Sequence, residues 1–151
     1  MSRDLDDLYQ SVILDHNKTP RNFHELPPPA SHADGHNPLC GDRLTVWVDL
    51  EGDTVKDVAF LGNGCAISKA SASMMTAAVK GKSRAEAMAL ADEFQKLVTG
   101  KLEGAAERKA LGKLQALAGV SEYPVRVKCA SLAWHTLKAA IAGAAEPVST
   151  E

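Results

Sequence analysis

Cysteine is scarce in this sequence of 151 residues, which contains only Cys40, Cys65 and Cys129. An odd number of widely spaced cysteines argues against a disulfide framework. The simplest alternative is three buried free thiols that act as small hydrophobic side chains. The residues around each cysteine, described below, favour a shared chemical role instead.

Aromatic residues, excess charge and long apolar runs are also lacking. Aromatics make up 5% of the chain and the net charge is −2, so the sequence offers neither the basic surface nor the stacking platforms of a nucleic-acid-binding protein. No apolar run approaches the roughly 20 residues that cross a bilayer, so no membrane contact is expected. The acidic, amphipathic start of the chain does not resemble a signal peptide, and we expect a cytoplasmic protein.

What is present is typical of a globular protein, with 45% hydrophobic and 24% charged residues. This length predicts one domain over residues 1–151, with an ordered core at about 5–142. Apolar residues with helical spacing predict a first helix from about residue 5, which ends before Pro20. Residues 26–38 are rich in proline and predict irregular backbone with at most one short strand, in which His32 and His36 are loop residues.

The hydrophobic period then changes from helical to alternating. Residues 44–50 and 54–61 alternate around a turn at Gly52, which predicts an antiparallel hairpin. Cys40 precedes the first strand and Cys65 follows the second. Because the strands run in opposite directions, the hairpin should bring these two cysteines to the same end.

Helical spacing returns after Cys65. A capping box at Ser83 and Glu86 marks one of these helices, and the order of elements predicts an α+β fold in which a small antiparallel sheet is covered by helices. Trp47 and Trp134 are expected in the core. The expected helices cover residues 66–79, 83–98, a short part of 101–121, and the stretch from 127 or 128 onward.

Cys40, Asp42, Cys65 and Cys129 form a candidate metal site. Gly41 permits the tight turn that lets Cys40 and Asp42 reach one ion. Cys65 and Cys129 are each expected at a helix N-terminus, which favours thiolate over thiol. Sulfur-rich tetrahedral ligand sets suit zinc. The spacing lacks the paired Cys-x-x-Cys halves of a zinc finger.

Two cations lie next to this candidate site in the sequence. Three thiolates, one carboxylate and a divalent ion leave a net negative charge, which nearby cations would offset. Arg126 and Lys128 immediately precede Cys129 and fit that need. The alternative is that both are ordinary surface charges.

Together these motifs resemble the IscU/NifU-type family of iron–sulfur cluster assembly proteins, and in particular its SufU branch of zinc-dependent sulfurtransferases. The resemblance extends over roughly residues 5–142. It rests on the stretches Asp15-His16-Asn17-Lys18-Thr19-Pro20-Arg21-Asn22, Asn37-Pro38-Leu39-Cys40-Gly41-Asp42, Gly64-Cys65-Ala66-Ile67-Ser68 and Arg126-Val127-Lys128-Cys129-Ala130.

The resemblance implies specific roles. Cys40, Asp42, Cys65 and Cys129 match the zinc ligands of the SufU branch, and Cys40 matches the thiol that accepts persulfide sulfur from a cysteine desulfurase of the SufS type. In that branch the thiol that matches Cys40 leaves the zinc when the desulfurase docks, and the arginine that matches Arg126 assists this exchange of ligands. The sulfur then passes toward a downstream iron–sulfur scaffold.

Two features of the sequence favour SufU over a scaffold of the IscU type. Scaffolds have histidine where this chain has Lys128, and protonated lysine is a poor ligand. The interval between Cys65 and Cys129 is also longer, with the extra segment placed at residues 101–121.

Other functions remain open at this point. One is a scaffold that holds an iron–sulfur cluster on the same cysteines, and another is a structural zinc domain that docks partners. A cysteine hydrolase is disfavoured because the sequence places no histidine beside any cysteine.

Overall fold

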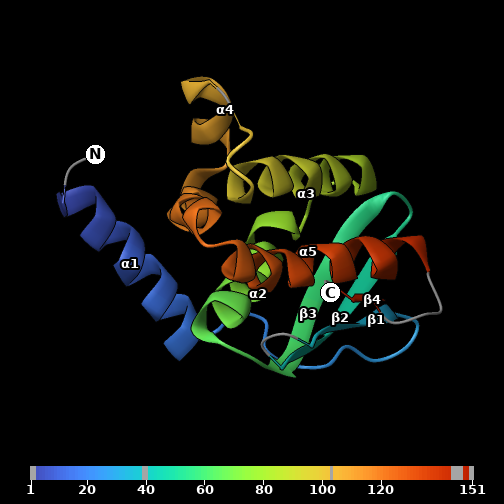
Figure 1. The fold of residues 1–151 in the computed structure, drawn as a ribbon. Coiled ribbons are helices and arrows are strands. Elements are labelled where there is room, and N and C mark those ends of the chain that lie inside the picture. The colour runs from blue at the N-terminus through green and yellow to red at the C-terminus, as the bar shows by residue number, and fades with distance from the viewer. Residues whose placement is uncertain (1–2, 39–40, 103, 144–147, 150–151) are drawn as a thin grey trace.

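The computed structural model describes residues 3–38, 41–102, 104–143 and 148–149, with side chains between residues 10 and 143 of those ranges. The fold is α+β, as the sequence predicts, and its helices gather on one face of the sheet (Figure 1). The helices are α1 (Arg3–Lys18), α2 (Ala66–Val79), α3 (Arg84–Val98), α4 (Ala105–Ala110), the 3-10 helix η1 (Gly112–Glu122) and α5 (Pro124–Ala142). The strands are β1 (Ser31–Asn37), β2 (Asp42–Glu51), β3 (Thr54–Asn63) and β4 (Val148–Ser149).

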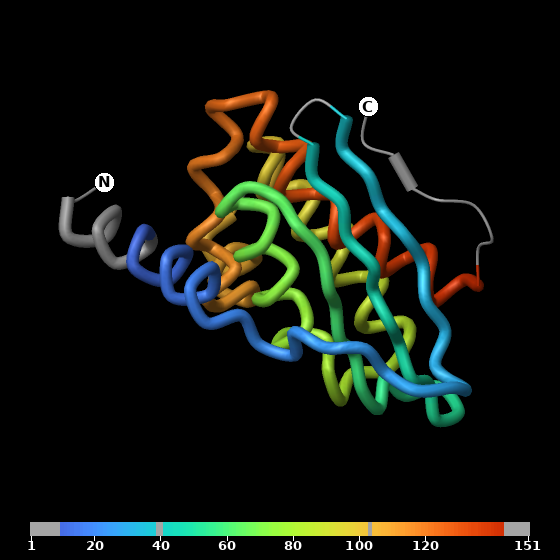
Figure 2. The backbone as a smooth tube through the Cα atoms, turned by 90° about the horizontal axis from the view of Figure 1, so that it is seen from below, coloured from blue at the N-terminus to red at the C-terminus, as the bar shows by residue number. Residues whose placement is uncertain are grey.

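The sheet has the strand order β3-β2-β1-β4. The pairs β1–β2 and β2–β3 are antiparallel, whereas the short β4 lies parallel to β1. Figure 2 shows the three long strands side by side with the helices behind them. The predicted hairpin is confirmed, and its register pairs Arg43 with Asn63, which carries the chain back to the start of β2 just before Cys65.

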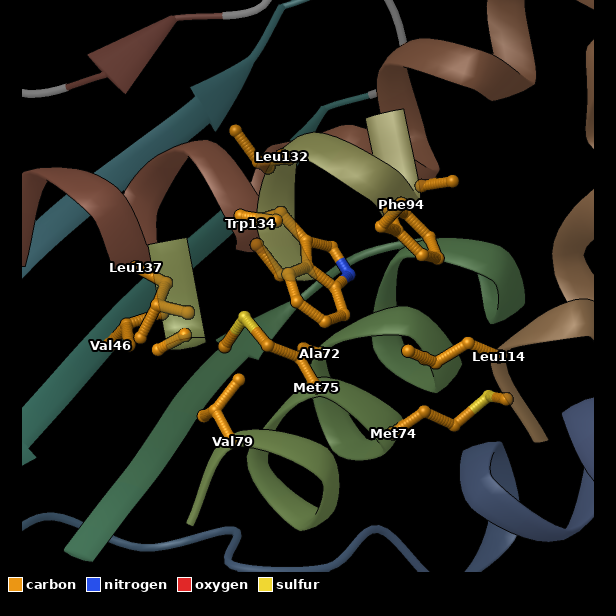
Figure 3. Close-up of a cluster of buried hydrophobic side chains, with 14 of the residues drawn as sticks. Val46, Ala72, Met74, Met75, Val79, Phe94, Leu114, Leu132, Trp134 and Leu137 are labelled. Atoms are coloured by element: carbon orange, nitrogen blue, oxygen red, sulfur yellow. The ribbon is translucent and has the colours of Figure 1, made fainter. Parts of the chain in front are cut away.

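The core lies between the sheet and the helices. Trp134 on α5 is 1% exposed, and its ring stacks on Phe94 of α3 with the ring centroids 4.7 Å apart (Figure 3). The indole nitrogen donates to Ser71 Oγ at 3.2 Å, so the one polar atom of the ring is paired. Trp134 is a core residue, as predicted. Trp47 is not, because the alternation along β2 turns it to the outer face of the sheet, where it is half-buried near His32.

The strand β1 corrects the expectation of irregular backbone around His32 and His36. Both histidines lie on β1, on the outer face, and alternate with buried Ala33 and Gly35. The period of two was present in the sequence, but the buried residues are small and lack the β-branched character of a typical strand. They are small because α5 packs closely here, and a Cβ on Gly35 would overlap the Thr136 hydroxyl.

The segment before Cys129 also differs from the prediction. It forms two helical pieces, α4 and η1, rather than one short helix. The last helix begins at Pro124, three or four residues earlier than expected. Proline lacks a backbone N–H. At the first helical position no hydrogen bond is lost, because the N–H of any residue there has no partner within the helix. None of the described helices is both long and apolar enough to span a membrane.

His16 ties the end of α1 to α2. The sequence suggests a surface or capping role, but His16 is 5% exposed and its Nδ1 lies 2.8 Å from Ser73 Oγ. The same hydroxyl accepts a hydrogen bond from the Arg21 backbone N–H at 2.8 Å. Although a histidine and a serine meet here, Ser73 is fully buried and cannot reach a substrate. The pair therefore holds the fold together.

This burial predicts a loss of stability in acid. Burial, followed by the charge of Arg21, lowers the pKa of His16 below its usual 6.5. As the pH falls below about 6.5, the unfolded chain takes up the proton first, so the stability present above that pH is progressively lost. His16→Gln should reduce the fall in unfolding free energy between about pH 7 and pH 5, measured by urea unfolding.

The matched control is His24→Gln, which changes an exposed histidine. It should leave the pH dependence as it is in the unaltered chain. Equal pH slopes for the unaltered chain and His16→Gln would contradict the account. Burial also lowers the pKa of His135. The acid sensitivity that results is common to all three proteins, because His135 is unchanged in each.

Candidate metal centre

Three of the four predicted ligands meet at one end of the sheet. The ligand atoms of Asp42, Cys65 and Cys129 all lie within 4.8 Å of one another. They come from the start of β2, the residue before α2 and the first half of α5, which approach one another at one end of the molecule (Figure 2). Cys40, the fourth predicted ligand, lies outside the described residues.

Asp42 is fully buried and is held from two sides. Its Oδ1 accepts a hydrogen bond from the Cys65 backbone N–H at 2.9 Å, and its Oδ2 accepts one from Asn37 Nδ2 at 3.2 Å. A Cβ on Gly64 would lie only 2.6 Å from Oδ1, so the loop before Cys65 approaches the carboxylate as only glycine allows. Gly41 has φ +73°, which agrees with the predicted tight turn before Asp42.

Cys65 occupies the N-cap position of α2, as predicted. Its Sγ accepts a hydrogen bond from the Ser68 backbone N–H at 3.4 Å, and the side chain is half-buried. The first turn of a helix has unpaired amide groups and a positive dipole end, both of which attract negative charge. The local structure therefore prepares this sulfur to bind a cation.

Cys129 differs from the prediction that it opens a helix. It lies five residues after the start of α5 at Pro124 and is fully buried. Its sulfur accepts a hydrogen bond from Asn37 Nδ2 at 3.5 Å and lies 3.7 Å from the Val125 carbonyl oxygen, to which a thiol would donate. A side-chain amide, rather than free amide groups at a helix end, thus donates to this sulfur.

Arg126 is exposed and faces both sulfurs. The negative charge of Cys65 is the largest cause that raises the pKa of the guanidinium, followed by its hydrogen bond with Cys129. Lys128 is half-buried on the same helix. Of the two cations singled out in the sequence, Arg126 is the one that the structure couples to the sulfurs.

Sequence reasoning missed Asn37, although a signal was available. Asn37 belongs to the same motif as Asp42, and antiparallel pairing across a hairpin places the two residues opposite each other. An expected strand over residues 31–37 would have pointed to this contact.

Comparison with known proteins places the chain in a family. The family model described as "NifU-like N terminal domain" matches residues 8–130, a range that includes all four candidate ligands. This chain belongs to that family. The resemblance to IscU/NifU-type proteins is therefore confirmed, and the family is one of iron–sulfur cluster assembly.

Relatives of this NifU-like domain carry two kinds of name. The chain is 46% identical over 143 residues to the iron–sulfur cluster assembly scaffold protein IscU of Streptococcus pyogenes serotype M1, covering 91% of this chain and 84% of that protein. It is 45% identical over 138 residues to the zinc-dependent sulfurtransferase SufU of Bacillus subtilis (strain 168), covering 91% and 92%. A crystal structure of the Fervidobacterium islandicum protein FiSufU, described as a scaffold for the SUF system, superposes with a TM-score of 0.79 at 33% identity, covering 86% and 93%.

The donor set of this NifU-like domain fits a zinc-type ion. Zinc–sulfur bonds of about 2.3 Å in a tetrahedron separate neighbouring ligand atoms by about 3.8 Å. The ligand atoms of Asp42, Cys65 and Cys129 lie at most 4.8 Å apart, so small side-chain movements would bring them to the separation that zinc requires. Within the described ranges, no other three acidic, cysteine or histidine ligand atoms come this close, and the group contains no histidine.

The approach of Gly64 to Asp42 predicts a sensitive position. In Gly64→Ala the new methyl group must displace the carboxylate of Asp42 in the candidate site, because it would otherwise lie 2.6 Å from Oδ1. Zinc affinity should fall by about ten-fold or more, measured by competition with a chromogenic chelator. Gly119→Ala is the control, because nothing lies within 4 Å of its Cβ position. Equal zinc affinities for the two variants would contradict this geometry.

Proposed function

We propose that this chain is a zinc-dependent sulfur acceptor that takes persulfide sulfur from a cysteine desulfurase for iron–sulfur cluster assembly. The observation that carries the proposal is the group formed by Asp42, Cys65 and Cys129, which lacks histidine and has the Arg126 guanidinium against two sulfurs. The 45% identity with a zinc-dependent sulfurtransferase supports it.

Zinc would be held by these three residues and by Cys40, and when bound it would keep the thiols deprotonated near neutral pH. The three candidate ligands among the described residues are held by hydrogen bonds. Cys65 and Cys129 each accept an N–H hydrogen bond, and Asp42 accepts two. Such bonds stabilise a ligand where it is and lower its nucleophilicity. We assign anchoring to these three residues, and sulfur acceptance to Cys40 because it matches the sulfur-accepting thiol of the SufU branch.

The transfer is a thiol exchange between Cys40 and the partner. The Cys40 thiolate attacks the outer sulfur of the persulfide on the desulfurase, that S–S bond breaks, and the partner's cysteine leaves as a thiolate. Cys40 then carries the persulfide, and no external oxidant or reductant is required. Arg126 would offset the negative charge on the sulfurs while Cys40 is engaged with the partner.

The partner would be a desulfurase of the SufS type, and the sulfur would pass to a downstream iron–sulfur scaffold. The reaction needs reduced thiols, which the cytoplasm maintains, and we place the protein there.

A scaffold of the IscU type is the second candidate. The 46% identity with a protein named as such a scaffold favours it, and cysteine thiolates are the usual ligands of iron–sulfur clusters. Against it, Lys128 stands where the scaffold pattern has histidine. Metal content separates the two: about one zinc per chain and a colourless protein support the sulfur acceptor, whereas retained iron and sulfide support the scaffold.

Sulfur transfer is tested with the zinc-loaded protein, a SufS-type desulfurase and cysteine. Arg126→Ala should keep its zinc, because Arg126 is not a ligand, but should form the Cys40 persulfide at least about ten-fold more slowly. Arg126→Lys should recover part of the rate, and Lys128→Ala is the control for loss of a nearby cation. Persulfide formation is followed by mass spectrometry of the intact chain.

Two results would count against the proposal. Unchanged persulfide formation in Arg126→Ala would remove the role of Arg126. Desulfurase stimulation that persists in zinc-bound Cys40→Ala would instead support a structural zinc domain that only docks the partner.

A further inference from the structure

Asn37, the last residue of β1, contacts two candidate ligands that come from different elements. Its Nδ2 lies 3.2 Å from Asp42 Oδ2 and 3.5 Å from Cys129 Sγ, and the side chain is fully buried. An amide nitrogen carries two hydrogens, so it can donate to the carboxylate and to the sulfur at the same time. Asn37 therefore spans the gap between the sheet and α5.

The orientation of this amide is fixed by its neighbours. The opposite orientation would place Oδ1 against the Asp42 carboxylate, acceptor against acceptor. In the orientation observed, Asn37 Oδ1 is buried without a hydrogen-bond partner. A buried acceptor without a partner lowers stability, and an apolar side chain of similar size would avoid that cost. The two hydrogen bonds that Asn37 donates to Asp42 and Cys129 offset the cost of its buried Oδ1.

The fold explains why this position can reach both ligands. Antiparallel register places Asn37 directly opposite Asp42 on the buried face of the sheet. The helix α5 lies so close to β1 that Gly35, two residues earlier on the same face, has no room for a Cβ beside Thr136. The same close packing brings Cys129 of α5 within reach of the Asn37 amide.

We propose that Asn37 is a positioning residue of the metal centre. It sets the separation between Asp42 and Cys129, and its N–H···S hydrogen bond keeps Cys129 as an anchored thiolate rather than an exchanging one. Outer residues of this kind orient metal ligands and adjust their basicity. The inference rests on the proposed function only in that a metal is bound, and it does not depend on sulfur transfer.

Three variants test this role. Asn37→Asp keeps the shape of the side chain but replaces the donor Nδ2 with an acceptor oxygen. Asn37→Leu keeps a similar volume and has neither a donor nor an acceptor. Asn63→Asp is the matched control, because it adds the same charge at an exposed position two residues before Cys65. Zinc affinity is measured by chelator competition, and the charge on the sulfurs is read from the thiolate-to-cobalt absorption band of the Co²⁺-substituted protein.

Both Asn37 variants should bind zinc about ten- to hundred-fold more weakly and shift the cobalt band, whereas Asn63→Asp should change neither. Thermal unfolding of the metal-free proteins identifies a variant that fails to fold, in which case the remaining variant carries the test, with Asn37→Ala as a smaller replacement. Weaker affinity with an unshifted cobalt band would reduce Asn37 to a general packing role and overturn the inference. Normal affinity with an unshifted band would overturn it as well.

These outcomes are distinct from failure of the proposed function. If the unaltered chain binds neither zinc nor cobalt, the proposed function fails together with this inference. If the unaltered chain binds both ions and the Asn37 variants behave like it, only the inference on Asn37 fails.

Discussion

The close approach of Asp42, Cys65 and Cys129 is the constraint on which the rest of the structure depends. Their ligand atoms lie within 4.8 Å of one another, and two of the three residues are buried. Ionised groups gathered in this way repel one another and lose hydration, which is tolerated only if a cation compensates. Arg126 is exposed, and one guanidinium would not balance three such charges. A divalent ion bound by the three groups would supply the missing compensation.

The fold supplies the rigid part of this arrangement. The β1–β2 register, the glycine before Cys65 and the close packing of α5 on β1 each fix one ligand relative to another. Backbone or side-chain N–H groups then take part of the negative charge of each described ligand. Exchange is assigned to Cys40 in the proposal because Cys40 matches the sulfur-accepting thiol of the SufU branch.

Much of this could be predicted from the sequence where local rules decide the outcome. Alternation and a turn at Gly52 were sufficient for the hairpin, and the capping box at Ser83 with Glu86 correctly marked the start of α3. Cys65 was correctly expected at a helix start because helical spacing follows it. In each case the signal lies within a few residues of the element that it specifies.

The predictions that failed depend on contacts between distant segments. The sequence allowed at most a short strand where β1 lies, because the buried residues of β1 are small, and they are small because α5 lies against them. The same contact accounts for Asn37, whose partner Cys129 lies 92 residues away. The burial of His16 depends on Ser73, 57 residues away. The last helix was expected from residue 127 or 128, but it begins at Pro124, because proline is suited to the first position of a helix.

X-ray absorption at the zinc edge of the zinc-loaded protein tests the central claim most directly. The account predicts one zinc per chain with about three sulfur neighbours at about 2.3 Å and one oxygen at about 2.0 Å, which corresponds to the three cysteines and Asp42. A zinc shell made only of nitrogen and oxygen atoms, or a protein that binds no stoichiometric zinc, would contradict it.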